Sequence, residues 1–102
     1  MKAVVITAVT ALVLGVAGVA SADQGLAQKN ACMSCHGVDK KIVGPAFKEV
    51  AAKYKADKAA PDRLAKHVKE GTKGNWGQVP MPPNPQVKDE DIKKIVAWVL
   101  TL

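Results

Sequence analysis

The sequence predicts an all-α fold, and three observations carry that prediction. Apolar residues recur at the three- and four-residue spacing of an amphipathic helix in segments near 45–54, 61–70 and 88–100. No segment alternates apolar and polar residues as a half-buried strand does. The prolines that crowd 72–87 exclude a helix there and disfavour a central strand.

The first 22 of the 102 residues have the three parts of a secretory signal peptide. Lys2 supplies the positive charge, 3–19 form an apolar stretch, and 20–22 form an A-x-A cleavage site. The alternative is an uncleaved membrane anchor, but the apolar stretch is shorter than the roughly 20 residues that a spanning helix needs. We therefore expect a signal peptide at 1–22 and a mature domain at 23–102, exported to the periplasm and not inserted in the membrane after cleavage.

The mature domain would have 80 residues and only two cysteines, Cys32 and Cys35. At this size a hydrophobic core alone rarely supplies more than about 3–5 kcal/mol of stability. Aromatic side chains are few, and the cysteines are too close together to staple distant segments. We therefore expect the chain to fold around a large apolar group.

The net charge of the whole chain is +6, and loss of Lys2 with the signal peptide leaves +5. The lysines are spread along the domain rather than gathered in a basic arm, so we expect no nucleic-acid partner. Two interpretations of this charge stay open. It can serve solubility alone, or it can steer the protein toward acidic patches on partner proteins, which raises association rates and weakens with salt.

The first two helices of the mature domain are expected on either side of a loop. Asp23 can cap a short helix from Gln24 to about Asn30. A loop at 37–44 follows, and Pro45 suits the first turn of the second helix. The buried stripe of the second helix is expected to consist of Phe47, Val50, Ala51 and Tyr54.

The last two helices are expected on either side of a long, stiff loop at 72–87, and long loops in small domains are usually functional. The third helix should run from about Pro61 to Glu70, with Gly71 just past its end. The last should run from about Lys88 to Leu100, with acidic residues near its positive N-terminal end. The inward-facing residues are expected to be Leu64, Ala65 and Val68, then Ile92, Ile95, Val96 and Val99.

A C-x-x-C-H motif, the signature of covalent haem attachment, is formed by Cys32, Cys35 and His36. The two-residue gap lets both thiols reach the vinyl groups at one edge of a porphyrin, and the adjacent imidazole is then placed under the iron. We therefore expect one haem c, bound covalently through Cys32 and Cys35, with His36 as a ligand of its iron.

Three other interpretations of this motif compete with haem attachment. A thioredoxin-like redox pair would be expected in a βαβ context, which this sequence lacks. Half of a zinc site is disfavoured, because three adjacent ligands do not form a tetrahedral cage. The third alternative is a plain structural disulfide.

The second axial ligand can be sought among three methionines. Met1 leaves with the signal peptide, and Met33 is held inside the attachment motif on the side of His36. Met81 is left, and the prolines beside it reduce the entropy lost in holding its thioether. His67 is a less favoured ligand because it lies on a lysine-rich helix, and Met81 as an ordinary core or surface residue is the other alternative.

An iron with His36 and Met81 as axial ligands has no open position for oxygen or peroxide. This ligand pair also raises the reduction potential relative to two nitrogen ligands. We therefore expect a carrier of single electrons and not an enzyme. Two alternatives stay open: a five-coordinate haem sensor or enzyme, in which Met81 does not bind, and a haem-free thiol oxidoreductase.

Several stretches of the sequence stand out together: Ala31–His36, Val43–Tyr54, Trp76–Gly77 with Pro80–Asn84, and Ala97–Leu100. In these stretches the chain resembles the short bacterial class I cytochromes c, the cytochrome c-551 (cytochrome c8) group. They span nearly the whole mature domain. The resemblance implies the class I cytochrome c fold, with about four helices wrapped around one covalent haem, and a role as a periplasmic electron shuttle.

The same resemblance implies roles for four further residues. The Pro45 carbonyl would accept a hydrogen bond from the histidine ligand and strengthen that ligand. The Trp76 indole N–H would bind a haem propionate, with core packing as the alternative. Asn84 would donate a hydrogen bond near the methionine sulfur, or else be a turn residue. His67 would meet a propionate, or else be a solvated helix residue.

A carrier of this kind would dock through the exposed haem edge near the Cys32 and Met81 loops, guided by the surrounding lysines. We expect a monomer. Its expected donor is a membrane bc-type complex, and its acceptor a nitrite reductase, a terminal oxidase or a photosynthetic reaction centre. Two departures from the group, a longer segment at 85–87 and Lys88 in place of a Ser or Asp cap, leave the start of the last helix open.

Overall fold

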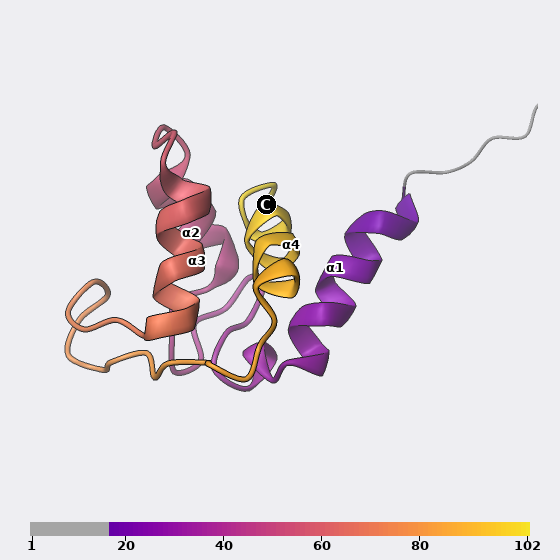
Figure 1. Ribbon diagram of the computed structural model, residues 1–102. Coiled ribbons are helices and arrows are strands. Elements are labelled where there is room, and N and C mark those ends of the chain that lie inside the picture. The colour runs from indigo at the N-terminus through magenta and orange to yellow at the C-terminus, as the bar shows by residue number, and fades with distance from the viewer. Residues whose placement is uncertain (1–16) are drawn as a thin grey trace, which may run out of the picture.

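The computed structural model describes residues 17–102, so the first 16 residues of the predicted signal peptide lie outside the described residues (Figure 1). Its α-helices are α1 (Ala17–Lys29), α2 (Phe47–Tyr54), α3 (Ala60–Glu70) and α4 (Asp89–Val99), with a short 3₁₀ turn, η1 (Cys32–Ser34), after α1. Over this range the chain forms isolated bridges but no strand. The predicted all-α class is therefore confirmed.

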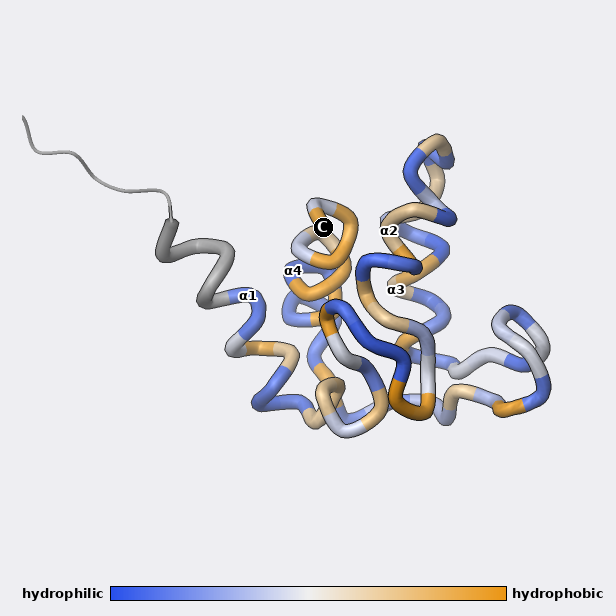
Figure 2. The backbone as a smooth tube through the Cα atoms, turned by 180° about the vertical axis from the view of Figure 1, so that it is seen from behind, coloured by the Kyte–Doolittle hydropathy of each residue, from blue (hydrophilic) through white to orange (hydrophobic). Residues whose placement is uncertain are grey.

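Helix α4 is the centre of the hydrophobic core. It contacts α1, α2 and α3, and Figure 1 shows it between α1 on one side and the α2–α3 pair on the other. Figure 2 shows hydrophobic residues mainly in the part of α4 toward the C-terminus, whereas the loop after α3 is largely hydrophilic. The predicted buried stripes of α2 and α4 are confirmed: Phe47, Val50, Ala51 and Tyr54 of α2, and Ile92, Ile95, Val96 and Val99 of α4. In α3 only Leu64 of the predicted stripe is fully buried, and Ala65 and Val68 are partly buried against the core.

The first helix differs from its prediction at the N-terminal end. It begins at Ala17, so Asp23 lies within α1 instead of capping it. Three of the six residues at 17–22 are alanine, the residue with the highest helix propensity, and no proline interrupts this stretch. The predicted C-terminal end is nearly right, because α1 ends at Lys29.

The second helix begins two residues later than Pro45. Ala46 is its N-cap, with an extended backbone, and α2 starts at Phe47. Its first free amides are satisfied by the chain that precedes it, since Phe47 N–H donates to the Gly37 carbonyl over 2.9 Å and Lys48 N–H to the Val38 carbonyl over 3.1 Å. Backbone carbonyls therefore replace a capping side chain and fix the motif loop to α2.

The third and fourth helices follow their predictions closely. Pro61 lies in the first turn of α3, and Gly71, with φ of 81°, follows the last turn and donates to the His67 carbonyl over 2.9 Å. Lys88 is the N-cap of α4 and makes no side-chain cap, as the departure from the family pattern suggested. Acidic residues in the first turn of α4 interact favourably with the positive end of the helix dipole and stabilise the helix instead of a capping side chain. No helix among residues 17–102 is long and apolar enough to cross a membrane.

Candidate haem-binding site

A cavity of about 300 Å³ lies between the helices and the two long loops. That volume is at the lower end of the roughly 300–1,000 Å³ of small-molecule and cofactor sites. Its inner wall consists of core residues of α2, α3 and α4, including Val50, Leu64 and Val96, so an apolar group in the cavity would complete the core. Of the eight predicted site residues, seven line it: Cys32, Cys35, His36, Pro45, His67, Trp76 and Met81.

The cysteines stand on a single tight turn at one end of the cavity. Ala31 has a left-handed backbone (φ 63°), and the amides of Cys35 and His36 both donate to the Cys32 carbonyl, over 3.2 and 3.0 Å. Both thiols are free and half-buried. Burial raises the pKa of the Cys32 thiol; a backbone hydrogen bond opposes this to a smaller extent, and the nearby Cys35 adds a still smaller increase. A reactive redox pair needs a lowered thiol pKa, so Cys32 is poorly suited to thiol exchange.

The imidazole of His36 is held by the Pro45 carbonyl and by the close approach of Gly44. Its Nδ1 lies 2.7 Å from the Pro45 carbonyl oxygen, which is the predicted contact. A carbonyl can only accept, so Nδ1 carries the proton and Nε2 is left with a lone pair for a metal. Gly44 lies against the ring so closely that a Cβ there would come within 2.7 Å of Cε1. The Cys35 carbonyl accepts from both Val43 and Gly44 and closes this loop.

Two aromatic side chains support His36 from the core, and sequence reasoning did not assign them to the site. The Phe47 ring stacks on the imidazole, with centroids 4.9 Å apart and planes at 17°. Trp98 packs edge-on against Phe47 at 5.5 Å, and its side chain is only 5% exposed. Trp98 lies three residues after the predicted core residue Ile95, on the same face of the helix, so its burial could have been predicted from the sequence.

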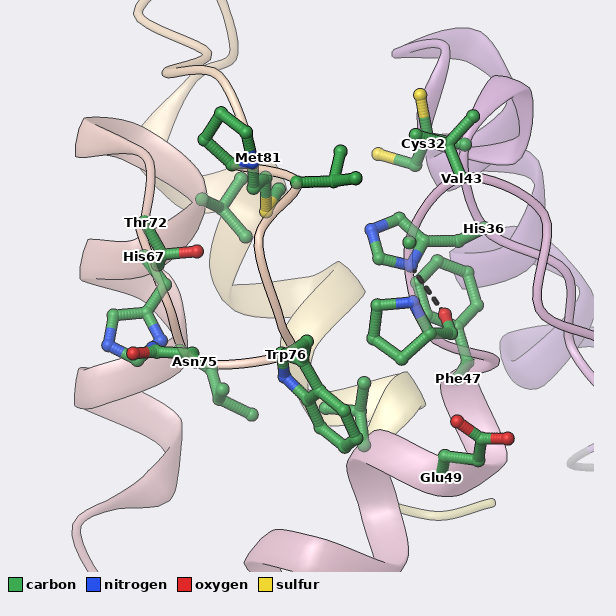
Figure 3. A pocket seen from close by; sticks show the side chains of 18 of the residues that line it. Cys32, His36, Val43, Phe47, Glu49, His67, Thr72, Asn75, Trp76 and Met81 are labelled. Carbon is green, nitrogen blue, oxygen red and sulfur yellow. Dashed lines mark hydrogen bonds between the residues drawn. The ribbon is translucent and has the colours of Figure 1, made fainter.

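Met81 is held by its backbone at the base of the second loop. Its N–H and carbonyl pair with the carbonyl and N–H of Thr72, each over 3.0 Å. Gly71 makes this approach possible, because a Cβ there would come within 2.7 Å of the Met81 oxygen and 2.9 Å of the Pro83 nitrogen. Figure 3 shows Met81 on the opposite side of the cavity from His36, with Cys32 close to the histidine.

Asn84 lies outside the cavity lining and anchors the second loop to α3. Its amide nitrogen Nδ2 donates to the carbonyls of Val68 and Pro82, over 3.1 and 3.2 Å, and its backbone N–H donates to Val68 and Lys69. The hydrogen bond expected near the Met81 sulfur is not formed in this structure. The free carbonyls at the end of α3 need donors, and Asn84 supplies them.

Trp76 and His67 lie toward the end of the cavity away from Cys32 (Figure 3). Trp76 is 36% exposed and lies outside the buried core, so core packing does not account for it. The Lys53 ammonium lies 4.4 Å from the centroid of its ring. His67 is half-buried, and burial lowers the pKa of its imidazole, as do the positive charges of Arg63, Lys53 and Lys66.

The donor set distinguishes among the possible occupants. Among residues 17–102 no group of three or more His, Cys, Asp or Glu side chains could hold a metal ion, which argues against the zinc alternative. The imidazole of His36 and the thioether of Met81 instead lie on opposite walls of the cavity. Two thiols at one end and a largely apolar inner wall fit a covalently attached, flat, apolar group such as haem c.

Comparisons with known proteins agree with this chemistry. The cytochrome c family profile matches residues 22–102. The chain is 59% identical to cytochrome c-551 of Allochromatium vinosum, over 85% of this chain and 93% of that protein. It is 49% identical to cytochrome c-552 of Nitrosomonas europaea, over 100% and 99% of the two chains. The crystal structure of wild-type Nitrosomonas europaea cytochrome c552 superimposes with a TM-score of 0.76 and 51% identity, over 78% of this chain and 98% of that one.

Proposed function

The chain belongs to the cytochrome c family, and on that premise we propose that it is a soluble periplasmic shuttle whose iron is held by His36 and Met81. Cytochromes c bind haem c covalently through two cysteines, so Cys32 and Cys35 attach one haem in this protein. The chain is a small cytochrome c that transfers electrons and is not an enzyme.

One observation carries the proposed axial pair: His36 and Met81 lie on opposite walls of the cavity that the cysteines border (Figure 3). Bound haem supplies an iron that gains or loses a single electron. The chain's part is to keep the same two side chains in place in both redox states. Pro45 orients the imidazole, and the bridge between Thr72 and Met81 fixes the backbone from which the thioether extends, which would limit the movement of both ligands when the charge changes.

We assign the propionates to the end of the cavity at Trp76 and His67. In a porphyrin the propionates lie on the side away from the vinyl groups that Cys32 and Cys35 bind. Trp76 offers an indole N–H at that end, and Lys53 and the cationic residues of α3 give the region a positive potential. These groups would stabilise the propionate charges.

The docking face is proposed at the mouth of the cavity, between the two loops. Val43 and Val79 are 51% and 62% exposed and line the cavity with Lys41, and Ile42 beside Val43 is 54% exposed. An apolar patch beside a lysine on a mature chain of net charge +5 suits a redox partner with an apolar contact area and an acidic rim. A bc-type complex as donor, and a nitrite reductase, terminal oxidase or photosynthetic reaction centre as acceptor, are proposed on this basis.

Export to the periplasm is proposed from the signal peptide at 1–22. The family profile starts at residue 22, next to the proposed start of the mature domain at 23. Mass spectrometry of the purified protein tests this boundary. A mass equal to residues 23–102 plus one haem is expected, and a mass that includes residues 1–22 would contradict it.

The visible spectrum of the purified protein tests the proposed carrier directly. Sharp low-spin bands on reduction, and the weak red band of an iron–methionine bond on oxidation, are expected. High-spin bands that shift with carbon monoxide would identify a five-coordinate sensor or enzyme instead. The absence of a Soret band would identify a haem-free thiol protein.

A further inference from the structure

The Thr72–Met81 bridge closes a segment of residues 73–80. Between its two ends, this segment forms one hydrogen bond with the rest of the described domain. Gly74 and Gly77 have φ of 76° and 108°, and no side chain or backbone lies within 4 Å of where their Cβ atoms would be. Among the hydrogen bonds of the described residues, a single one reaches this segment, from the Lys53 ammonium to the Asn75 carbonyl over 3.0 Å. This segment also carries Trp76, the indole assigned to the propionates.

The Lys53 ammonium has further partners around it. It lies 4.4 Å from the centroid of the Trp76 ring and 5.6 Å from that of Tyr54, a buried core residue of α2. Because Lys53 projects from the last turn of α2, the same side chain joins a packed helix to a loop that is otherwise held only at its two ends. A cation over an indole face is attracted by the ring, which restricts the ring's orientation.

We propose that Lys53 is a positioning residue of this cytochrome: its ammonium holds the Asn75–Trp76 segment against α2 and so keeps the Trp76 indole at the propionate end of the cavity. This inference rests on the proposed propionate site. Loss of the lysine would free the segment, expose the propionates to water and remove a positive charge. Removal of the positive charge, and of the indole hydrogen bond that would offset propionate charge, stabilises the oxidised iron relative to the reduced iron and lowers the reduction potential.

The test uses the complete haem-containing protein and the variant Lys53→Met, which keeps most of the aliphatic stem but removes the charge and the donor. Hydrogen exchange of the Trp76 indole N–H and of the 75–77 amides is followed by NMR in the reduced state. Because methionine can form neither the hydrogen bond to Asn75 nor the cation–π interaction with Trp76, exchange at these sites should accelerate about tenfold. Exchange in α4 should stay at the native rate, and the reduction potential should fall.

Two further variants separate positioning from charge alone. Lys66→Met removes another positive charge near His67 but no contact with the loop, so exchange at Trp76 should stay native. Lys53→Arg keeps a cation and donors, so it should restore most of the protection at the indole. Native exchange in Lys53→Met, or equal acceleration in Lys66→Met, would overturn the proposal.

The methionine–iron band keeps this test distinct from that of the proposed function. It should be present in the native protein and in all three variants, because Met81 is anchored by Thr72 and not by Lys53. Absence of the band from the native protein would contradict the axial assignment whatever Lys53 does. A native band with unaltered Trp76 exchange in Lys53→Met would overturn the role of Lys53 alone.

Discussion

The two loops that supply the proposed axial ligands are held in different ways. The loop of His36 is joined to the core, through the Phe47 stack, Trp98 behind it and backbone bonds to the start of α2. The loop of Met81 is closed by its own backbone at Thr72 and anchored by Asn84, and its outer part is exposed. The histidine is therefore fixed by the packing that stabilises the domain, and the methionine by local geometry that can yield while the domain stays folded.

The largest expected effect comes from Gly71→Ala on the Met81 side. The alanine would need φ of 81° with ψ of 169°, a region used essentially by glycine, and its Cβ would meet two backbone atoms of the Met81 loop. We expect the red methionine–iron band to be lost or weakened, and the stability to fall by about 2–4 kcal/mol. Haem attachment and histidine ligation should persist, since Gly71 lies far along the chain from the motif.

Gly74→Ala is the matched control for Gly71→Ala. Its φ is also positive, at 76°, but open space surrounds its Cβ position. It should cost about 1 kcal/mol in strain alone and keep the native spectrum. Equal spectra for both variants would show that the close approach of Gly71 does not position Met81.

The next effect is expected from Gly44→Ala on the His36 side. The new Cβ would press on an imidazole that the Pro45 carbonyl and the Phe47 ring prevent from moving away. We expect a loss of about 1–3 kcal/mol in the unfolding free energy of the whole domain, measured by denaturant titration. Gly25→Ala, which has open space in α1, should be neutral or slightly stabilising. If Gly44→Ala altered only the red methionine–iron band and left the unfolding free energy unchanged, the claim that the His36 loop is held by the packing of the whole domain would be wrong.

Asn84→Ala should have a smaller effect, confined to the Met81 loop. It removes two donors from carbonyls of Val68 and Pro82 in a partly exposed place, at a cost of about 1 kcal/mol. Hydrogen exchange should accelerate at 81–87 and stay native in α2. A shift of the methionine–iron band as large as that of Gly71→Ala would instead indicate a direct bond between Asn84 and the sulfur.

The smallest effect concerns the charge of His67. Partial burial and the cations Arg63, Lys53 and Lys66 hold its pKa below the ordinary 6.5, so the unfolded chain binds this proton more readily and stability falls as pH drops through 6.5. A propionate nearby would act in the opposite direction on the pKa. The protonated imidazole disfavours the extra positive charge of oxidised iron, so the potential should rise as pH falls from 8 to 5. His67→Gln should flatten this curve, and a flat native curve would exclude the contact.

The features that depend on short spacings along the chain could be predicted from the sequence. The C-x-x-C-H motif predicted that Cys32, Cys35 and His36 share one site, and helical periodicity predicted the buried faces of α2 and α4. Elimination among three methionines led to Met81, which the structure does place across the cavity from His36. Each of these inferences needs only local geometry or a count.

Features that depend on contacts between distant segments were missed or misplaced. The start of α2 is set by carbonyls of Gly37 and Val38, so Pro45 could not reveal it. Asn84 bonds to the end of α3, and Lys53 reaches a loop 22 residues further along the chain. Such partners are brought together only by the packing of helices, and no spacing in the sequence reports them.

The most direct test of the axial pair is the Met81→Ala variant of the haem-containing protein. With only a methyl group at position 81, the iron should bind added imidazole or azide, lose the red band and show a lower reduction potential, while the native protein binds neither ligand at the same concentrations. If Met81→Ala kept the native six-coordinate spectrum and potential, Met81 would not be the second ligand, and the account of this protein as a closed His36/Met81 electron carrier would be wrong.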